Sequence, residues 1–279
     1  MTTATFTVVQ YAAGAVTVLI LLRTAKCGSP FALARDGLRR LLEPAYRRWF
    51  LLATAVMTFN LIETAFDDAL TARLGLDFTG WLWRWEGALI APLQRADWPP
   101  LIAVLTFFYI VVFPMLIVAS MLLHAARNDF RAYRGLLLGL VFNYVLVLPF
   151  LIFFPVREAW SGASGHITLL IDRLGPSIMH AYRATSALDN SFPSFHTSMA
   201  ATTAFLAWRN CPQPFAWVVS VSASLVVFST LYLGIHWACD VAAGLFVAAA
   251  VCAIVDRRRC PQISTTPAPS AANRELLRR

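Results

Sequence analysis

Two short polar segments of this 279-residue chain carry side chains that are able to do nucleophilic and acid–base chemistry. The first segment, 191–196, reads Ser-Phe-Pro-Ser-Phe-His, and the second, 229–240, contains His236 and Asp240. Histidine changes its charge near neutral pH and can act as nucleophile, acid or base. Two histidines with a carboxylate that orients one of them are therefore the first candidates for a reactive site.

The second segment can orient its own histidine. His236 and Asp240 are four residues apart, so they share one face if the segment is helical. Asp240 can then accept a hydrogen bond from one ring nitrogen, which leaves the other free as nucleophile or base. We expect His236 to begin the last helix after a tight turn at Gly234. A lone histidine at a membrane surface is more often a packing residue, but an aspartate inside an apolar span favours function.

The first segment has the composition of an anion-binding helix start. Pro193 suits the first helical position, and Ser191 or Asn190 suits the cap. The free backbone N–H groups and the helix dipole attract an anion there, and the hydroxyl of Ser194 adds a donor. His196 would lie in the first turn, beside the bound anion.

Long apolar blocks surround both segments. The chain is 58% hydrophobic and 14% charged, whereas a soluble domain is about 45–50% apolar and about 25% charged. The blocks have the length of membrane-spanning helices, so the sequence predicts an all-α transmembrane bundle of about six to seven spans. The candidate spans are residues 6–22, 50–70, 101–124, 135–154, 193–208, 215–233 and 236–255.

Charge predicts the orientation and excludes one class of partner. The net charge is +8, but Lys and Arg flank apolar spans, which is typical of orientation signals rather than of nucleic-acid binding. Of 23 basic residues, 17 fall on the side that follows the odd-numbered spans. The N-terminus is then outside a plasma membrane and the C-terminus is cytoplasmic. Both polar segments would lie at the extracytoplasmic face.

The chain divides into three expected parts. Residues 1–49 hold the first span and a basic helix over 30–49 on the inner leaflet, for which a solvated loop is the alternative. Residues 50–255 form the catalytic bundle, with the reactive motifs within 155–253. Residues 256–279 form a disordered basic tail.

At these motifs the sequence resembles the phosphatidic acid phosphatase type 2 superfamily, which includes lipid phosphatases and vanadium haloperoxidases. Residues 193–196 match its Pro-Ser-Gly-His motif, with Phe195 in the glycine position. Its motif Ser-Arg-x5-His-x3-Asp is matched by Ser229, His236 and Asp240. The resemblance covers roughly residues 155–253.

The sequence departs from the family at two cationic positions. Thr230 stands where the third motif has arginine, and Phe150 stands where the first motif, Lys-x6-Arg-Pro, would need its lysine before Arg157. These departures resemble the inositol phosphorylceramide synthase branch. Arg157 is our first choice to replace the missing arginine and Arg183 the second, although Arg157 can instead be a surface residue paired with Glu158.

The resemblance implies a role for each motif residue. His236 would attack phosphorus and form a phosphohistidine, Asp240 would orient it, and His196 would protonate the leaving alkoxide and then deprotonate the acceptor. No metal and no cofactor is implied. The residues expected around the phosphate are Arg157, Arg183, Ser194, Phe195 and Ser229.

The resulting expectation is a lipid phosphoryl-transfer enzyme that acts on a phosphorylated lipid within the membrane, such as a phospholipid or polyprenyl phosphate. The acceptor is either water or an alcohol such as inositol or a lipid hydroxyl. The alternatives are a phosphatase only, a non-enzymatic lipid transporter, and a scaffold with a lapsed site. In the second span, Asn60 and Glu63 either line a headgroup cavity or serve bundle packing.

Overall fold

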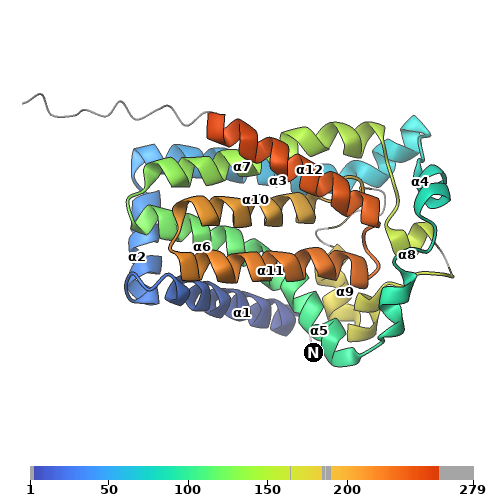
Figure 1. The fold of residues 1–279 in the computed structure, drawn as a ribbon, viewed down its shortest axis with the longest axis horizontal. Coiled ribbons are helices and arrows are strands. Elements are labelled where there is room, and N and C mark those ends of the chain that lie inside the picture. The colour runs from blue at the N-terminus through green and yellow to red at the C-terminus, as the bar shows by residue number, and fades with distance from the viewer. Residues whose placement is uncertain (1–2, 164, 184–185, 187–189, 258–279) are drawn as a thin grey trace, which may run out of the picture.

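The computed structural model describes residues 3–163, 165–183, 186 and 190–257. This part of the chain is helical and forms no sheet, and a single parallel bridge joins Val156 to Asn190. The predicted all-α membrane bundle is therefore confirmed. Figure 1 shows the long helices side by side along one axis, with short elements gathered at one end.

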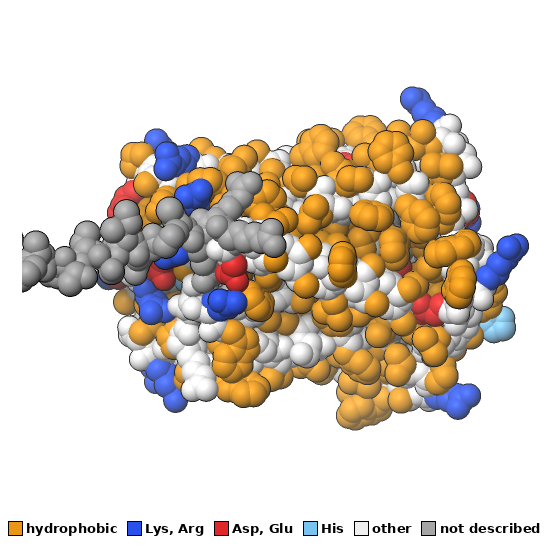
Figure 2. Space-filling view, turned by 45° about the horizontal axis from the view of Figure 1, so that its top comes forward, with side chains coloured by type: hydrophobic (Ala, Val, Ile, Leu, Met, Phe, Trp, Pro, Cys, Tyr) orange, Lys and Arg blue, Asp and Glu red, His pale blue; other side chains and the backbone are white. Residues whose placement is uncertain are grey.

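Five helical stretches are long and apolar enough to cross a membrane by length and composition. They are α1 (Thr3–Thr24), the α5–η2–α6 stretch (Pro99–Phe107, Phe108–Val112 and Phe113–Ala126), α7 (Phe130–Phe153), α11 (Gln213–Tyr232) and α12 (Ala238–Arg257). Each coincides with a predicted span. Figure 2 shows apolar side chains over the middle of one face, with Lys and Arg toward its two ends. This distribution suits a bilayer.

The other two predicted spans are also helical, but neither is among these five. Residues 50–70 lie within α3 (Pro44–Leu74), and residues 193–208 correspond to α10 (Phe195–Asn210). The 16-residue α10 packs against α7, α11 and α12 in the interior of the bundle. Its small residues allow close packing against these neighbours.

The predicted basic helix over 30–49 is divided in two. α2 (Pro30–Leu41) lies across one end of the bundle, and α3 then turns along the bundle axis (Figure 1). The division falls at Pro44, which is the first residue of α3 and disfavours a helical conformation in the residue before it. α2 packs so closely on α6 that a Cβ added to Gly37 would lie 2.7 Å from the Leu122 carbonyl oxygen. The helix is therefore part of the bundle's packing.

Short elements cover the opposite end of the bundle. They are α4 (Thr79–Glu86), η1 (Ala91–Arg95), α8 (Ala159–Gly162), η3 (Leu170–Leu174) and α9 (Pro176–Arg183). The turn between α11 and α12 is at this end, and so is the start of α10 (Figure 1). The two reactive segments therefore meet under this cap, far from α2.

Candidate active site

The two polar segments are bonded directly to each other. The backbone N–H of Ser194, at the start of α10, donates to the carbonyl oxygen of Asp240 in the first turn of α12 at 3.1 Å. A Cβ on Gly244, one turn further along α12, would lie 2.6 Å from the carbonyl oxygen of Ser194. The close approach of the two helices brings the histidine of each segment to one cavity.

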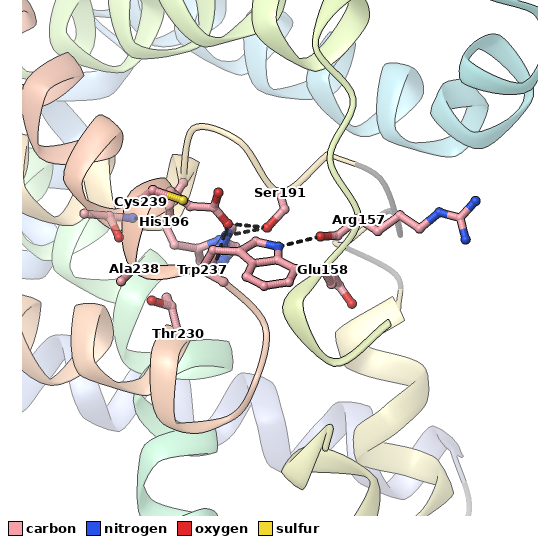
Figure 3. A network of polar contacts seen from close by, with 12 residues as sticks. Arg157, Glu158, Ser191, His196, Thr230, Trp237, Ala238 and Cys239 are labelled. Atoms are coloured by element: carbon pink, nitrogen blue, oxygen red, sulfur yellow. Dashed lines mark hydrogen bonds and ion pairs between the residues drawn. The ribbon is translucent and has the colours of Figure 1, made fainter. Parts of the chain in front are cut away.

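Two groups contact the ring of His236 directly. Its Nδ1 lies 3.2 Å from Asp240 Oδ2 and 3.0 Å from Ser191 Oγ. Ser191 Oγ donates to the same carboxylate oxygen at 2.5 Å, and the backbone N–H of Trp237 donates to it at 2.9 Å. Figure 3 shows Ser191 pointing into this network. With Nδ1 occupied, the lone pair of Nε2 is the one left for a substrate.

The turn before α12 fixes the backbone position of His236. The carbonyl oxygen of Thr230 accepts hydrogen bonds from the N–H groups of Ile235 and His236, at 3.1 and 3.0 Å. Gly234 has φ +80°, and a Cβ there would lie 2.4 Å from the Thr168 carbonyl oxygen, so the predicted tight turn is confirmed.

The last helix begins later than predicted, at Ala238 rather than His236. The carboxylate of Glu86 accepts from the backbone N–H groups of Ala238 and Cys239, at 2.6 and 3.0 Å. Those helix-end donors are therefore already used by the protein itself. His236 lies in the turn, where Asp240 still reaches it.

His196 is held mainly by aromatic rings. It lies in the first turn of α10, stacked on Tyr109 with ring centroids 4.3 Å apart and 21° between the planes, and Phe113 lies 4.7 Å away. The Tyr109 hydroxyl is 3.4 Å from His196 Nδ1. Tyr109 belongs to the π-helical turn η2, and such turns often occur at functional sites.

The two histidines face a common cavity. Their ring centroids are 6.3 Å apart, and both residues line the same cavity. The cavity is lined by Asn60, Thr64, Tyr109, Leu151, Glu158, Ser186, Asn190, Ser191, Phe195, His196 and His236. None of these lining residues, which all belong to the described part of the chain, is an arginine or lysine.

Both of the predicted phosphate-binding serines lie outside this lining. Ser194 is fully buried, and its Oγ caps α10 by accepting from the Thr197 N–H at 3.3 Å. Ser229 is also buried, and its Oγ donates to the Val226 carbonyl oxygen at 2.6 Å. Phe195, in contrast, does line the cavity. Ser194 thus caps the helix that carries His196, whereas the Ser229 side chain bonds within α11.

The two candidate arginines also lie outside the cavity lining. Arg157 extends away from the polar network (Figure 3) and forms an exposed ion pair with Asp77 at 3.3 Å, not with Glu158. Its backbone carbonyl accepts from Trp237 Nε1 at 2.8 Å, so the main chain at this position supports the residue after His236. Arg183 is nearer and pairs with Glu158 at 3.4 Å.

The cavity is lined by a buried carboxylate, Glu158, for which the sequence suggests only a surface pairing with Arg157. Glu158 is 1% exposed and lines the cavity. It accepts from Trp160 Nε1 and Ser186 Oγ, each at 2.5 Å, and from the Tyr182 hydroxyl. Burial and the Glu158 carboxylate raise the pKa of Tyr182 well above its ordinary value, so Tyr182 stays a donor. A glutamate beside a candidate motif arginine was the only sequence signal.

Comparison with known proteins places this chain in a family. The family model described as the PAP2 superfamily matches residues 70–254, which include both histidines, Asp240 and Glu158. No curated protein and no solved structure matches the chain. The matched residues make up well over half of the 279-residue chain, and members of this superfamily are generally phosphatases or phosphotransferases. The chain therefore belongs to the PAP2 superfamily of membrane proteins.

Proposed function

We propose that the protein transfers a phosphoryl-containing group from a membrane lipid through a phosphohistidine on His236. The observation that carries this proposal is the fixed ring of His236, whose Nδ1 is occupied by Asp240 and Ser191. A ring held in this way has one nucleophilic nitrogen and one orientation. A second histidine, His196, lies across the same cavity.

The two histidines have complementary tasks in the proposed reaction. Nε2 of His236 forms a bond to phosphorus while the bond to the leaving oxygen breaks, and His196 gives that oxygen a proton. His196 then takes a proton from the acceptor, whose oxygen attacks phosphorus and releases His236. Asp240 stabilises the positive charge that His236 carries meanwhile. The proton that His196 gives up in the first half-reaction is thus replaced by the one it takes from the acceptor in the second.

The charges around the cavity favour a phosphodiester as substrate, and hence headgroup transfer. A phosphomonoester dianion needs more positive charge nearby than a phosphodiester monoanion. The described lining contains Glu158 and neither Lys nor Arg, and Thr230 replaces the arginine of the third motif. The departures that resemble the inositol phosphorylceramide synthase branch point the same way. Hydrolysis is the second candidate, because water can use the same histidines.

The apolar helices and the charge distribution support an orientation within the membrane. The site is at the end of the bundle opposite the basic helix α2 (Figure 1). Because basic residues favour the cytoplasmic side, we propose that the site opens at the extracytoplasmic face of the plasma membrane. The substrate is then a lipid of the outer leaflet.

The experiment that tests this function follows two products at once. Purified full-length protein in detergent is given a panel of phosphate-labelled lipids, each with and without an added alcohol, and both free phosphate and new labelled lipid are measured. A labelled lipid that forms only with the alcohol identifies a transferase, and free phosphate alone identifies a phosphatase. Both products should be lost in His236→Ala.

Vanadate separates the enzyme from a transporter. It resembles the five-coordinate state of phosphorus, so a phosphoryl-transfer site should bind it and lose turnover. Lipid movement across vesicles that persists in vanadate and in His236→Ala, without either product, would contradict the proposal and favour transport.

A further inference from the structure

Helix α3 brings two polar side chains to the catalytic cavity from outside the residues that match the family. Asn60 and Thr64 both line the cavity, whereas the match begins at residue 70. The histidines and Asp240 lie within the matched residues. Asn60 and Thr64 therefore lie in the same cavity as the histidines but outside the residues that the family match covers.

Packing on α7 sets the rotation of α3. Phe59 and Glu63 are four residues apart and both contact Tyr144: the two aromatic rings meet edge-on at 6.1 Å, and the Tyr144 hydroxyl donates to Glu63 Oε2 at 3.4 Å. Asn60 and Thr64 are each one residue further along, about 100° around the helix. The contact with Tyr144 thus turns the Asn60–Thr64 stripe toward the cavity.

The two side chains are available to a ligand. Among the described residues, neither Asn60 nor Thr64 forms a side-chain hydrogen bond, although both are partly buried. A threonine inside a helix commonly donates to the carbonyl four residues earlier, as Thr203 does to Met199 at 2.8 Å. Thr64 does not make this bond, so its hydroxyl can bind a group in the cavity.

The polar groups of the cavity outside the two histidines suit a neutral ligand. An amide and a hydroxyl from α3 face it, and Glu158 already accepts from Tyr182, Trp160, Ser186 and Arg183. The Glu158 carboxylate already has four donors, so it is not free to bind a cation. The described lining has no Lys or Arg that could bind a second anion. Hydroxyl groups, which both donate and accept, match amide and hydroxyl partners.

We infer that Asn60 and Thr64 form a subsite for the hydroxyl-bearing alcohol that accepts the phosphoryl group. The inference rests on the proposed function. In the second half-reaction the alcohol oxygen bonds to phosphorus, the bond from phosphorus to His236 Nε2 breaks, and the hydroxyl proton passes to His196. The remaining hydroxyls of the alcohol bind the α3 stripe. Water has no further hydroxyl groups, so hydrolysis does not need the subsite.

The ratio of transfer to hydrolysis tests the subsite, because both products come from the same phosphohistidine. The double variant Asn60→Leu/Thr64→Val keeps side-chain size and removes the polar groups. With a labelled phospholipid donor, glycerol and inositol serve as soluble acceptors and diacylglycerol as the lipid acceptor. The ratio should fall about tenfold with the acceptor that uses the subsite, as expected for the loss of two hydrogen bonds. Which acceptor responds tells whether the hydroxyls come from solution or from the membrane.

Thr58→Val is the matched control, because Thr58 is on the same helix and is exposed on the outside of the bundle. It should leave the ratio unchanged. An unchanged ratio in the double variant, or hydrolysis without transfer to any acceptor in the wild type, would overturn the subsite while the phosphohistidine stands. If the double variant also loses hydrolysis, the ratio in Thr64→Val alone decides. Transfer or hydrolysis that persists in His236→Ala would instead overturn the proposed function.

Discussion

The two histidines of the cavity are held by different kinds of contact. His236 has its Nδ1 within 3.2 Å of both Asp240 and Ser191. His196 lies against two aromatic rings, and within the described part of the chain it has one polar contact, at 3.4 Å from the Tyr109 hydroxyl. A nucleophile needs one fixed nitrogen with its lone pair directed at the substrate. A proton carrier must change its charge twice in each cycle, so an aromatic cage that fixes the ring but bonds it weakly suits that task.

Among substitutions of the residues that hold the two histidines, the largest effect should come from Asp240→Asn, which removes the charge beside His236. The amide occupies the same space but no longer selects the tautomer or stabilises the positively charged ring. Turnover should fall by as much as roughly 10⁴-fold, the loss known for the same substitution in a Ser-His-Asp triad. Steady-state turnover of the labelled lipid in purified protein measures the loss.

Ser191→Ala sharpens this prediction, since it removes one contact to Nδ1 and leaves the carboxylate in place. Its effect should be smaller, about tenfold. Turnover of Asp240→Asn within threefold of wild type would show that the carboxylate does not orient His236.

A smaller effect should come from Tyr109→Phe, which keeps the ring stacked on His196 and removes only the hydroxyl. One weak hydrogen bond is lost, so we expect a three- to tenfold fall in turnover. Because Tyr109 positions His196, the acid and base limbs of the pH–rate profile should move as well. Tyr109→Leu, which also removes the stacked ring, should lower turnover further. Equal turnover of Tyr109→Leu and wild type would exclude a positioning role.

The smallest effect should come from Arg157→Ala. The side chain is 56% exposed and pairs with Asp77 at the surface, and exposed ion pairs contribute little. Turnover should change less than about twofold. Arg183→Ala should cost more, because Arg183 pairs with the buried Glu158. A loss of 100-fold or more in Arg157→Ala would mean that this side chain reaches the phosphate, as the motif comparison first suggested.

The long helices could be predicted from the sequence because each apolar block is long enough to span a bilayer. The pairing of His236 with Asp240 was predictable for a similar reason: both belong to a short segment, and local spacing fixes their distance. The break before α3 also has a local signal, Pro44, although the apolar pattern runs past it. Local information was thus sufficient for these features.

The aromatic cage and the buried Glu158 depend on contacts between segments that are far apart in the chain. Tyr109 lies 87 residues before His196 and sits in an apolar span, where one more aromatic residue gives no signal. Glu158 finds Tyr182 and Ser186 only after the chain has folded back over the site. The outward direction of Arg157 likewise follows from Asp77, which no family motif contains.

Trapping the covalent intermediate tests the central claim most directly. The protein is mixed with a labelled phosphate ester whose leaving group needs no proton, such as a p-nitrophenyl ester, and quenched in denaturant. We predict a label that is stable in alkali, released in acid, present in wild type and His196→Ala, and absent in His236→Ala. Label that persists in His236→Ala, or that maps to another residue, would contradict the assignment of His236 as the nucleophile.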